Sequence, residues 1–502
     1  MFHVTFDLDT IIMFIYMGAM LALGLYCARF IKTFEDFFVA GRRLGLMLCV
    51  GTMCTLFVGG SAVGIAGMGH DYGIGAVWYY LAYGIGFVIL AVTFVVPLRA
   101  MKQFTVSDIF SFRYDERCRL VSSVITFFAW IFFFAAFVIA GARVVEALLG
   151  WDFAFAILVT AGIFTIYTSV GGMWAVTMTD VVQFFIIVTA MLVLFPVGMY
   201  SVGGISALFA ATPPENISII PIMDGSMMTG LGYVIATVML TAPTGIIAPD
   251  VFIRVWCAKD DKTAKNTLLI TATLIAIFAF MLVMLGMAAK IMMPEIEHEM
   301  ALPWLVKHLL PAGISGFVLV ALMSAAISGA VPELIACSSI LARDIYQRFL
   351  DPNADEKKLL TVSRWLTFAV GIAGMALALK LPGFMDLTYN CYRIFVPIVL
   401  PAVAAGFYSK KTTSTSAFWS MITSGVVVVF MMIFMPFTFL TIFDPVIVGL
   451  IVSTATLFIV NRFTTPTPEQ IAFVEQAQQQ IAWFRKSEKE AKLAKKAAKA
   501  AS

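Results

Sequence analysis

Four charged side chains lie inside long apolar stretches of this sequence: Asp180, Asp250, Glu333 and Arg393. A charge in apolar surroundings costs free energy unless it is paired or hydrated, so ionisable residues in such segments mark functional sites by default. A carboxylate there can bind a cation or carry a proton, and the planar guanidinium of arginine suits an anionic group. These residues predict a path for ions and for a small polar solute, with an anionic solute among the options.

Two of these charges also have a plainer interpretation. Glu333 could be a protonated or hydrogen-bonded helix residue near the end of its apolar segment. Arg393 could bind an anionic solute or pair with Asp386. The sequence leaves both alternatives open.

Arg143 could clamp a carboxylate, but Glu146 follows three residues later, and residues three apart share a helix face. This spacing favours a simple ion pair. Asp250 could pair with either Arg143 or Arg393, or it could meet an incoming cation.

Two apolar segments contain residues that interrupt helices. The segment at 45–69 has Gly59-Gly60 at its middle, and the segment at 228–253 contains Pro243, Gly245 and Pro249. Proline removes a helical N–H and glycine lowers the cost of unwinding, so both segments are predicted to be broken helices. Matched broken helices are typical of a transporter binding site between inverted repeats. The predicted solute pocket is lined by Phe57, Gly60, Ser61, Thr241, Thr244, Gly245 and Arg393.

The composition identifies the class of protein that must position these residues. The chain has 502 residues, of which 61% are hydrophobic and 13% charged. Its mean hydropathy is +0.95. These values exclude a soluble or disordered protein, and the continuous apolar runs argue against a β-barrel. The prediction is an all-α polytopic protein of the plasma (inner) membrane, surrounded by membrane lipid.

Several functions find no support in the sequence. The net charge of +3 argues against nucleic acid as a partner, and nothing indicates an obligate protein partner. The seven cysteines form no CxxC pair, so no zinc or redox site is predicted. No HExxH motif, nucleophile elbow or phosphate loop is present, so we expect no enzyme activity and no organic cofactor.

Thirteen transmembrane helices are predicted, and the distribution of basic residues sets their orientation. With the helices placed as below, 28 of the 33 Lys and Arg residues fall on one side. Cytoplasmic loops carry the excess of Lys and Arg, so the N-terminus is predicted outside and the C-terminus in the cytoplasm. The predicted helices are 8–28, 45–69, 73–98, 120–147, 152–171, 178–202, 228–253, 266–290, 312–341, 361–380, 386–408, 415–436 and 438–460.

The two broken helices would begin two inverted repeats of five helices each. The predicted organisation is an extra N-terminal helix and loop (1–44), repeat one (45–202), an outer loop (203–227), repeat two (228–408), two C-terminal helices (409–465) and a basic cytoplasmic tail (466–502). In the tail, Ile471, Val474, Ile481 and Phe484 could form the apolar stripe of a helix. That helix could touch anionic lipid or remain solvated and partly frayed.

Five segments resemble the sodium:solute symporter family, which includes sodium-coupled sugar, proline, pantothenate and sialic acid carriers. They are FEDFFVAGRRLG (34–45), GGMWAVTMTDVVQ (171–183), RVWCAKDDKTAKN (254–266), CSSILARDIYQRF (337–349) and PAVAAGFYSKKTTSTSAFWSMITSG (401–425). Their order and spacing cover nearly the whole hydrophobic chain. The resemblance implies a five-plus-five inverted-repeat (LeuT-like) core with one extra helix before it and two after it.

The resemblance also implies a sodium site between the first core helix and the ninth span. Matched by motif, its carbonyl ligands would come from Thr55, Val58 and Ala325, and a pair of hydroxyls would fall on positions 328 and 329. Ser328 keeps this pattern, whereas Gly329 does not, which puts sodium coupling in doubt.

Nearby residues could compensate for the missing hydroxyl. Pro332 leaves the Ser328 carbonyl without a helical partner, and Glu333 lies one helical turn after Gly329, where a carboxylate could add negative charge or carry a proton. Asp180 matches the aspartate of the family's T-D-x-x-Q motif, which faces the ninth span. Asp180 and Glu333 are therefore the candidate coupling carboxylates.

The sequence thus predicts a secondary active transporter that couples Na⁺ to the uptake of a small polar solute by alternating access. Two alternatives remain: a carrier of the same fold coupled to H⁺ instead, and a membrane receptor that senses a solute. The sequence identifies neither the solute nor the stoichiometry.

Overall fold

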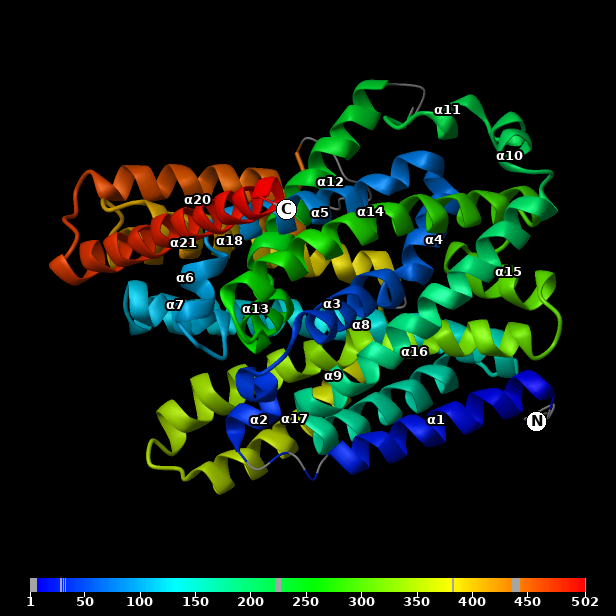
Figure 1. The fold of residues 1–502 in the computed structure, drawn as a ribbon, viewed down its shortest axis with the longest axis horizontal. Helices are drawn as coiled ribbons and strands as arrows, with labels where there is room; N and C mark the ends of the chain where they lie inside the picture. The colour runs from blue at the N-terminus through cyan, green and yellow to red at the C-terminus, as the bar shows by residue number, and fades with distance from the viewer. Residues whose placement is uncertain are drawn as a thin grey trace.

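The computed structural model describes residues 7–27, 29, 31, 33–221, 227–381, 383–435 and 443–501. Within these ranges the chain is helical, and its β pairing is limited to one isolated bridge between Leu44 and Ala258. The long helices run side by side along the horizontal axis of Figure 1.

Among the described helices, ten are long and apolar enough to cross a membrane. Three shorter apolar helices accompany them, Leu8–Met20, Leu46–Phe57 and Pro445–Asn461. The all-helical membrane prediction is therefore confirmed, while the count of thirteen spans and the orientation stay predictions. Helices away from the two breaks are α1 (Leu8–Cys27), α2 (Phe34–Val39), α5 (Trp78–Val92), α6 (Val95–Ala100), α7 (Val106–Arg113), α8 (Glu116–Leu149), α9 (Phe153–Ser201), α10 (Ile205–Ala211), α11 (Pro214–Ile217), α14 (Asp261–Met292), α15 (Ala301–Leu309), α16 (Ile314–Ser339), α17 (Glu356–Lys380), α18 (Phe384–Tyr408), α19 (Ser414–Phe434), α20 (Pro445–Asn461) and α21 (Pro468–Ala501).

Both predicted helix interruptions are present. The first lies between α3 (Leu46–Cys54) and α4 (Ala62–Tyr72), where Thr55–Gly60 forms a π-helical turn and Ser61 leaves helical geometry. The second lies between α12 (Met227–Ile247) and α13 (Pro249–Cys257), where Ala248 is extended with ψ 136°. The Pro249 ring excludes a helical conformation at Ala248, so the break falls there, while Pro243 is accommodated within α12.

The loop predicted between the spans 152–171 and 178–202 is wrong. The chain stays helical through this region as α9, and Gly172 alone departs, with φ 48° and ψ −160°. A side chain at 172 would also meet the Phe37 ring at 2.6 Å, so glycine suits both the backbone and the packing. One residue thus replaces a loop between the candidate spans Phe153–Trp174 and Val176–Ser201.

Three helices begin four or five residues earlier than predicted, because polar caps extend them beyond their apolar part. Asp115 caps α8 by accepting a hydrogen bond from the Cys118 amide at 2.9 Å. Asp260 and Asp355 cap α14 and α17 in the same way. A capping carboxylate satisfies an amide that the helix leaves free, so the first turn can be charged.

The centre of the molecule is built on α16, which packs along α8 and α9 and against the π-helical turn of the first broken helix. In the most apolar 18-residue stretch of Ile314–Leu350, 89% of the residues are buried inside the protein. On the other side of the break, α5 packs against α12, and α14 packs against α3, α4 and α5.

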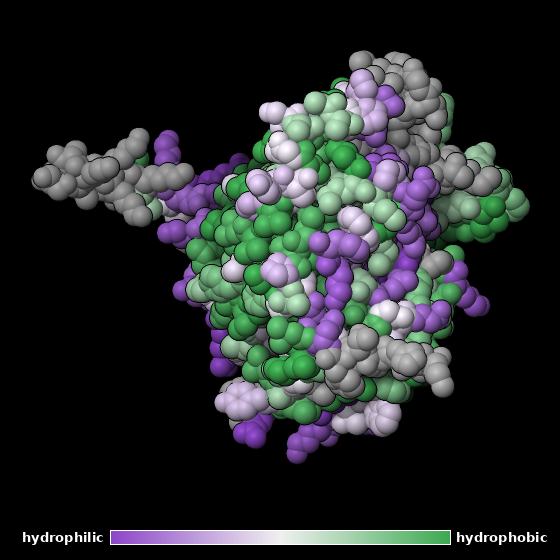
Figure 2. Space-filling model, turned by 90° about the vertical axis from the view of Figure 1, so that its right-hand side faces the viewer, coloured by the Kyte–Doolittle hydropathy of each residue, from purple (hydrophilic) through white to green (hydrophobic). Residues whose placement is uncertain are grey.

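The outer surface of the molecule is largely apolar. Figure 2 views the side on which α15 lies in Figure 1, and hydrophobic residues (green) cover much of it, with hydrophilic residues (purple) among them. Large apolar side chains are exposed along the helices; Ile15, Leu192 and Phe458 are 67%, 65% and 72% exposed. Such a surface is stable in contact with lipid and not with water.

The tail forms α21, which packs against α18 and α6. Val474, Ile481 and Phe484 of its predicted apolar stripe are buried, while Ile471 is half-buried. Lys410 pairs with Glu475 at 2.6 Å, and Lys265 pairs with Glu488. The stripe therefore packs on the protein itself.

Candidate functional site

Asp180 lies fully buried at the meeting point of three helices. Its Oδ1 accepts a hydrogen bond of 2.7 Å from Ser328 Oγ on α16, and its Oδ2 accepts one from Thr52 Oγ1 on α3. Asp180 itself comes from the second half of α9. The structure thus brings together a carboxylate and two hydroxyls, all hard oxygen groups of the kind that bind cations such as Na⁺.

The predicted sodium ligands surround this point in part. Thr55 is the first residue of the π-helical turn, and its hydroxyl donates to the Gly51 carbonyl at 2.9 Å. The backbone carbonyl of Thr55, and not its hydroxyl, remains the predicted ligand. Ala325 is buried on α16 one turn before Ser328. Val58 and Gly60 lie outside the residues whose side chains the structure describes.

Thr52 was missed in the sequence analysis, although its position offered a signal. It lies three residues before Thr55, on the same face of the helix that leads into the break. Its backbone carbonyl also accepts a hydrogen bond from Arg254 Nε at 3.0 Å. Thr52 therefore links Asp180 to the second broken helix.

The departure at Gly329 has a structural reason. A Cβ atom built at position 329 would overlap the ring of Phe137 on α8. The space that a serine or threonine side chain would need is therefore filled by an aromatic ring. Position 329 therefore lacks a hydroxyl because glycine is needed there for α16 to pack closely on α8.

Glu333 on α16 and Asp250 on α13 are both fully buried, and α13 packs against α16. The two carboxyls interact electrostatically, and both lie near Arg254 and the Trp130 indole. None of their four oxygens has a hydrogen-bond partner among the described residues. Asp250 therefore pairs with neither Arg143 nor Arg393, the two partners suggested by the sequence. The arginine nearest to it in sequence is Arg254, one helical turn later in α13.

Arg393 is occupied by a partner that the sequence analysis did not identify. Its Nη2 lies 2.8 Å from Asp444 Oδ2, and its Nε donates to the same oxygen at 3.0 Å. Asp444 precedes α20 and also caps it. The suggested pairing of Arg393 with Asp386 is wrong, because the start of α20 packs against α18 and places Asp444 beside Arg393.

Arg143 forms the predicted ion pair. Its Nη1 lies 2.9 Å from Glu146 Oε2, and it also pairs with Glu297 and, at 3.3 Å, with Glu299. Glu299 in turn accepts a hydrogen bond from the Phe384 amide. Arg143 is therefore a clamp between α8, the segment before α15, and α18.

Of the predicted pocket residues, Phe57 lies in an aromatic cluster. Its ring centroid is 4.6 Å from that of Tyr83 and 5.0 Å from that of Phe87, both on α5. Tyr79, also on α5, shares a hydrogen bond of 3.0 Å with the hydroxyl of Tyr392 on α18. Tyr392 was missed in the sequence analysis, although it directly precedes Arg393.

The polar pocket residues on α12 bond within their own helix. The hydroxyls of Thr241 and Thr244 each donate to the carbonyl four residues earlier in α12, those of Thr237 and Leu240, both at 2.7 Å. A Cβ at Gly245 would lie 2.9 Å from the Tyr83 carbonyl oxygen, so this glycine allows α12 to approach α5 closely. Ser61 is buried at the first break.

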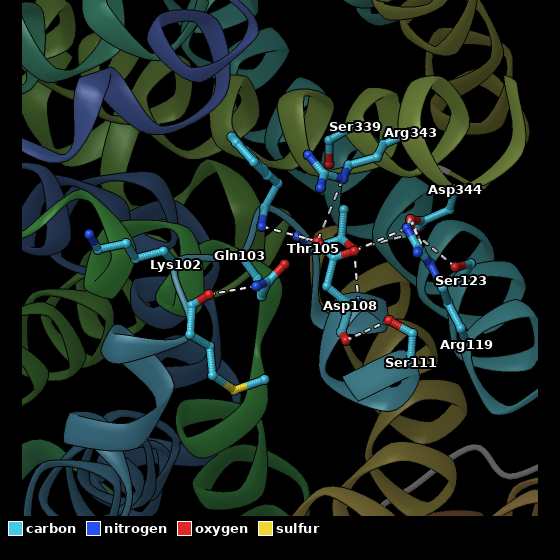
Figure 3. A network of polar contacts seen from close by, with 12 residues as sticks. Lys102, Gln103, Thr105, Asp108, Ser111, Arg119, Ser123, Ser339, Arg343 and Asp344 are labelled. Carbon is cyan, nitrogen blue, oxygen red and sulfur yellow. Dashed lines mark hydrogen bonds and ion pairs between the residues drawn. The ribbon is translucent and has the colours of Figure 1, made fainter. Parts of the chain in front are cut away.

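A second buried ion network lies at the far end of α16, where the chain continues as a π-helix from Ile340 to Leu350 (Figure 3). Arg119 on α8 pairs with Asp344 and, at 3.0 Å, with Asp108 on α7. Asp344 also accepts hydrogen bonds from Ser123 at 2.8 Å and Thr105 at 3.3 Å. These contacts hold α7, α8 and the end of α16 together.

Comparison with known proteins agrees with this arrangement. The model of the sodium:solute symporter family matches residues 37–424. The sodium/glucose cotransporter of Vibrio parahaemolyticus is 23% identical over 86% of both chains, and the sodium/pantothenate symporter of Haemophilus influenzae is 26% identical over 77% of this chain and 82% of its own.

The fold is also shared with solved structures. A Na⁺-coupled sialic acid symporter in a substrate-bound, outward-open state superposes with a TM-score of 0.78 at 19% identity, over 92% of this chain and 99% of the other. The relatives of this chain are transporters and not enzymes, and the match to this symporter family, together with the apolar helices, assigns the chain to the plasma membrane. The chain belongs to the sodium:solute symporter family.

Proposed function

We propose that this protein couples the downhill movement of Na⁺ to the uptake of a small polar solute by alternating access. The observation that carries the proposal is the meeting of Asp180, Ser328 and Thr52 beside the first helix break. A buried carboxylate that faces two hydroxyls is poorly compensated in the absence of a cation, and a dehydrated Na⁺ needs such oxygens.

In the proposed site, Ser328 supplies a hydroxyl and Asp180 the negative charge. The π-helical turn at the break would add carbonyl oxygens from Thr55 and Val58, and α16 would add that of Ala325. The Asp180 carboxylate takes the place of the hydroxyl that is absent at position 329. Its Oδ1 lies 2.7 Å from Ser328 Oγ, so both oxygens can bind the same ion.

The proposed solute pocket lies beside Phe57 and Ser61, at the first break. The Tyr79 and Tyr392 hydroxyls give polar contacts and the neighbouring rings give apolar ones, which suits a small polar solute. An anionic solute would have to compete with Asp444 for Arg393. The relatives named above act on glucose and pantothenate, so the family gives no single solute.

Alternating access would use the two ion networks as closures. The proposed architecture is thirteen spans with two inverted repeats, an outer N-terminus and a cytoplasmic C-terminus. The Arg119–Asp344–Asp108 network lies among the basic, cytoplasmic loops, and the Arg143 network lies at the opposite end of α8. Opening one while the other stays closed would expose the ion and solute sites to one side at a time.

The test begins with thermal unfolding of the purified protein in Na⁺ or in choline chloride, with glucose, proline, pantothenate and sialic acid as probes. A solute that stabilises the protein only with Na⁺ is then tested for accumulation in proteoliposomes under an imposed Na⁺ gradient. Accumulation that Asp180→Asn abolishes and Glu215→Gln, on the exposed α11, leaves intact supports the proposal. Stabilisation by solute without any accumulation would indicate a receptor, and accumulation driven by a pH gradient alone would indicate a proton-coupled carrier.

A further inference from the structure

Asp250 and Glu333 form a buried pair that the proposed sodium site does not use. Both side chains are fully buried, and their four carboxyl oxygens have no hydrogen-bond partner among the described residues. Two further polar atoms, Trp130 Nε1 and Arg254 Nη2, are also buried without a partner there. Trp130 and Arg254 both interact with the two carboxyls, so four side chains with unsatisfied polar atoms belong to one buried cluster.

The charges around this point do not balance. Arg254 interacts with Asp180, Asp250 and Glu333, so within the described part of the chain one guanidinium faces three carboxyls. An uncompensated charge buried in apolar surroundings is strongly destabilising. Two more positive charges are needed. The sodium ion proposed at Asp180 supplies one.

The second positive charge has a different chemical identity. A metal ion needs several hard oxygen ligands, whereas the other groups directed at the pair are N–H donors of Trp130 and Arg254, which disfavour a cation. A proton needs one acceptor, and two buried carboxyls that repel each other are stabilised when one of them is protonated. The remaining titratable groups that interact with the pair bring no further positive charge; they are Tyr79 and Tyr83 on α5, Cys337 on α16 and Cys391 on α18.

We propose that Asp250 and Glu333 hold one exchangeable proton between them, on one carboxyl or the other, and form a second coupling site, separate from Asp180. Asp250 follows the second helix break, and Glu333 lies on α16, against which the first break packs. With one carboxyl neutral, α13 stays packed against α16, whereas loss of the proton leaves two like charges that push the two helices apart. The protonation state therefore biases the position of α13 during the transport cycle.

The role of this proton in coupling rests on the proposed transport function. The proton itself can be measured without a solute. Infrared difference spectra of the purified protein in lipid nanodiscs, in H₂O and D₂O, report protonated carboxyls. Wild type and Glu356→Gln, which changes an exposed carboxylate of α17, are expected to share one buried protonated-carboxyl band. That band is expected to be lost in Asp250→Asn/Glu333→Gln, whose amides keep the size of the side chains.

The second measurement is the Na⁺-induced rise in melting temperature at mildly acidic and mildly alkaline pH. We expect the rise to depend on pH in wild type and to be independent of pH in the double variant, which also shows that this variant is folded. Unchanged infrared bands in the double variant, or an equal pH dependence in both proteins, would overturn the shared proton. A wild type without any Na⁺-induced rise would instead contradict the proposed function and leave the infrared result standing.

Discussion

The Ser328 hydroxyl on α16 donates a hydrogen bond of 2.7 Å to Asp180 Oδ1 on α9, across 148 residues of sequence. Both side chains are buried, and Thr52 from the first broken helix completes the cluster. Three helices that would otherwise be joined by apolar contacts thus share one polar point. Movement of any of them changes the ligands available to an ion there.

Replacing Asp180 with asparagine is expected to weaken Na⁺ binding about ten- to hundredfold. The change removes the negative charge of the proposed site, and interactions with a charged group contribute about 1.5–3 kcal/mol, where about 1.4 kcal/mol corresponds to a factor of ten. The measurement is the Na⁺ concentration that gives half of the maximal rise in melting temperature. An unaltered midpoint would remove Asp180 from the site.

Replacing Ser328 with alanine should have a smaller effect, about fivefold, because one neutral hydroxyl contributes about 1 kcal/mol. Ser338→Ala is the matched control. Ser338 is buried on the same helix, but its hydroxyl donates to the Ile335 carbonyl at 3.0 Å. Equal Na⁺ midpoints for the two variants would contradict a ligand role for Ser328.

Gly329→Ser alone is expected to destabilise the protein by about 1–3 kcal/mol, because the new side chain would overlap the Phe137 ring. Combined with Phe137→Leu, which makes room on α8, the serine should cost less and should tighten Na⁺ binding. A double-mutant cycle of melting temperatures measures this coupling. Strictly additive effects would show that Phe137 does not decide the residue at position 329.

Arg393 and Asp444 are expected to behave as a structural pair. Breaking a buried ion pair by removing one partner costs about 3–5 kcal/mol, so Arg393→Gln and Asp444→Asn should each lower the melting temperature. The double variant should lose less than the sum of the two. Loss of solute binding in Arg393→Gln but not in Asp444→Asn would instead assign Arg393 to an anionic solute.

Much of the fold could be predicted from the sequence, because it depends on local chemistry. Glycine at 59 and 60 and proline at 249 disfavour a continuous helix wherever they occur, so both breaks were predictable. The spacing of Arg143 and Glu146 similarly predicted their ion pair. The helix starts were less accurate, because a capping aspartate outside the apolar run decides where the first turn begins.

The partners of the buried charges could not be predicted from the sequence. Asp444 reaches Arg393, and Thr52 and Ser328 reach Asp180, only because distant helices cross at those points. The same holds for Glu333, which lies one turn from Gly329 yet faces Asp250 and Trp130. The sequence by itself determined that this is a membrane protein with two broken helices and a few costly buried charges. Which charge meets which partner was decided only by the tertiary structure, because the energy of a buried charge depends on a few ångströms of packing between helices that the sequence places far apart.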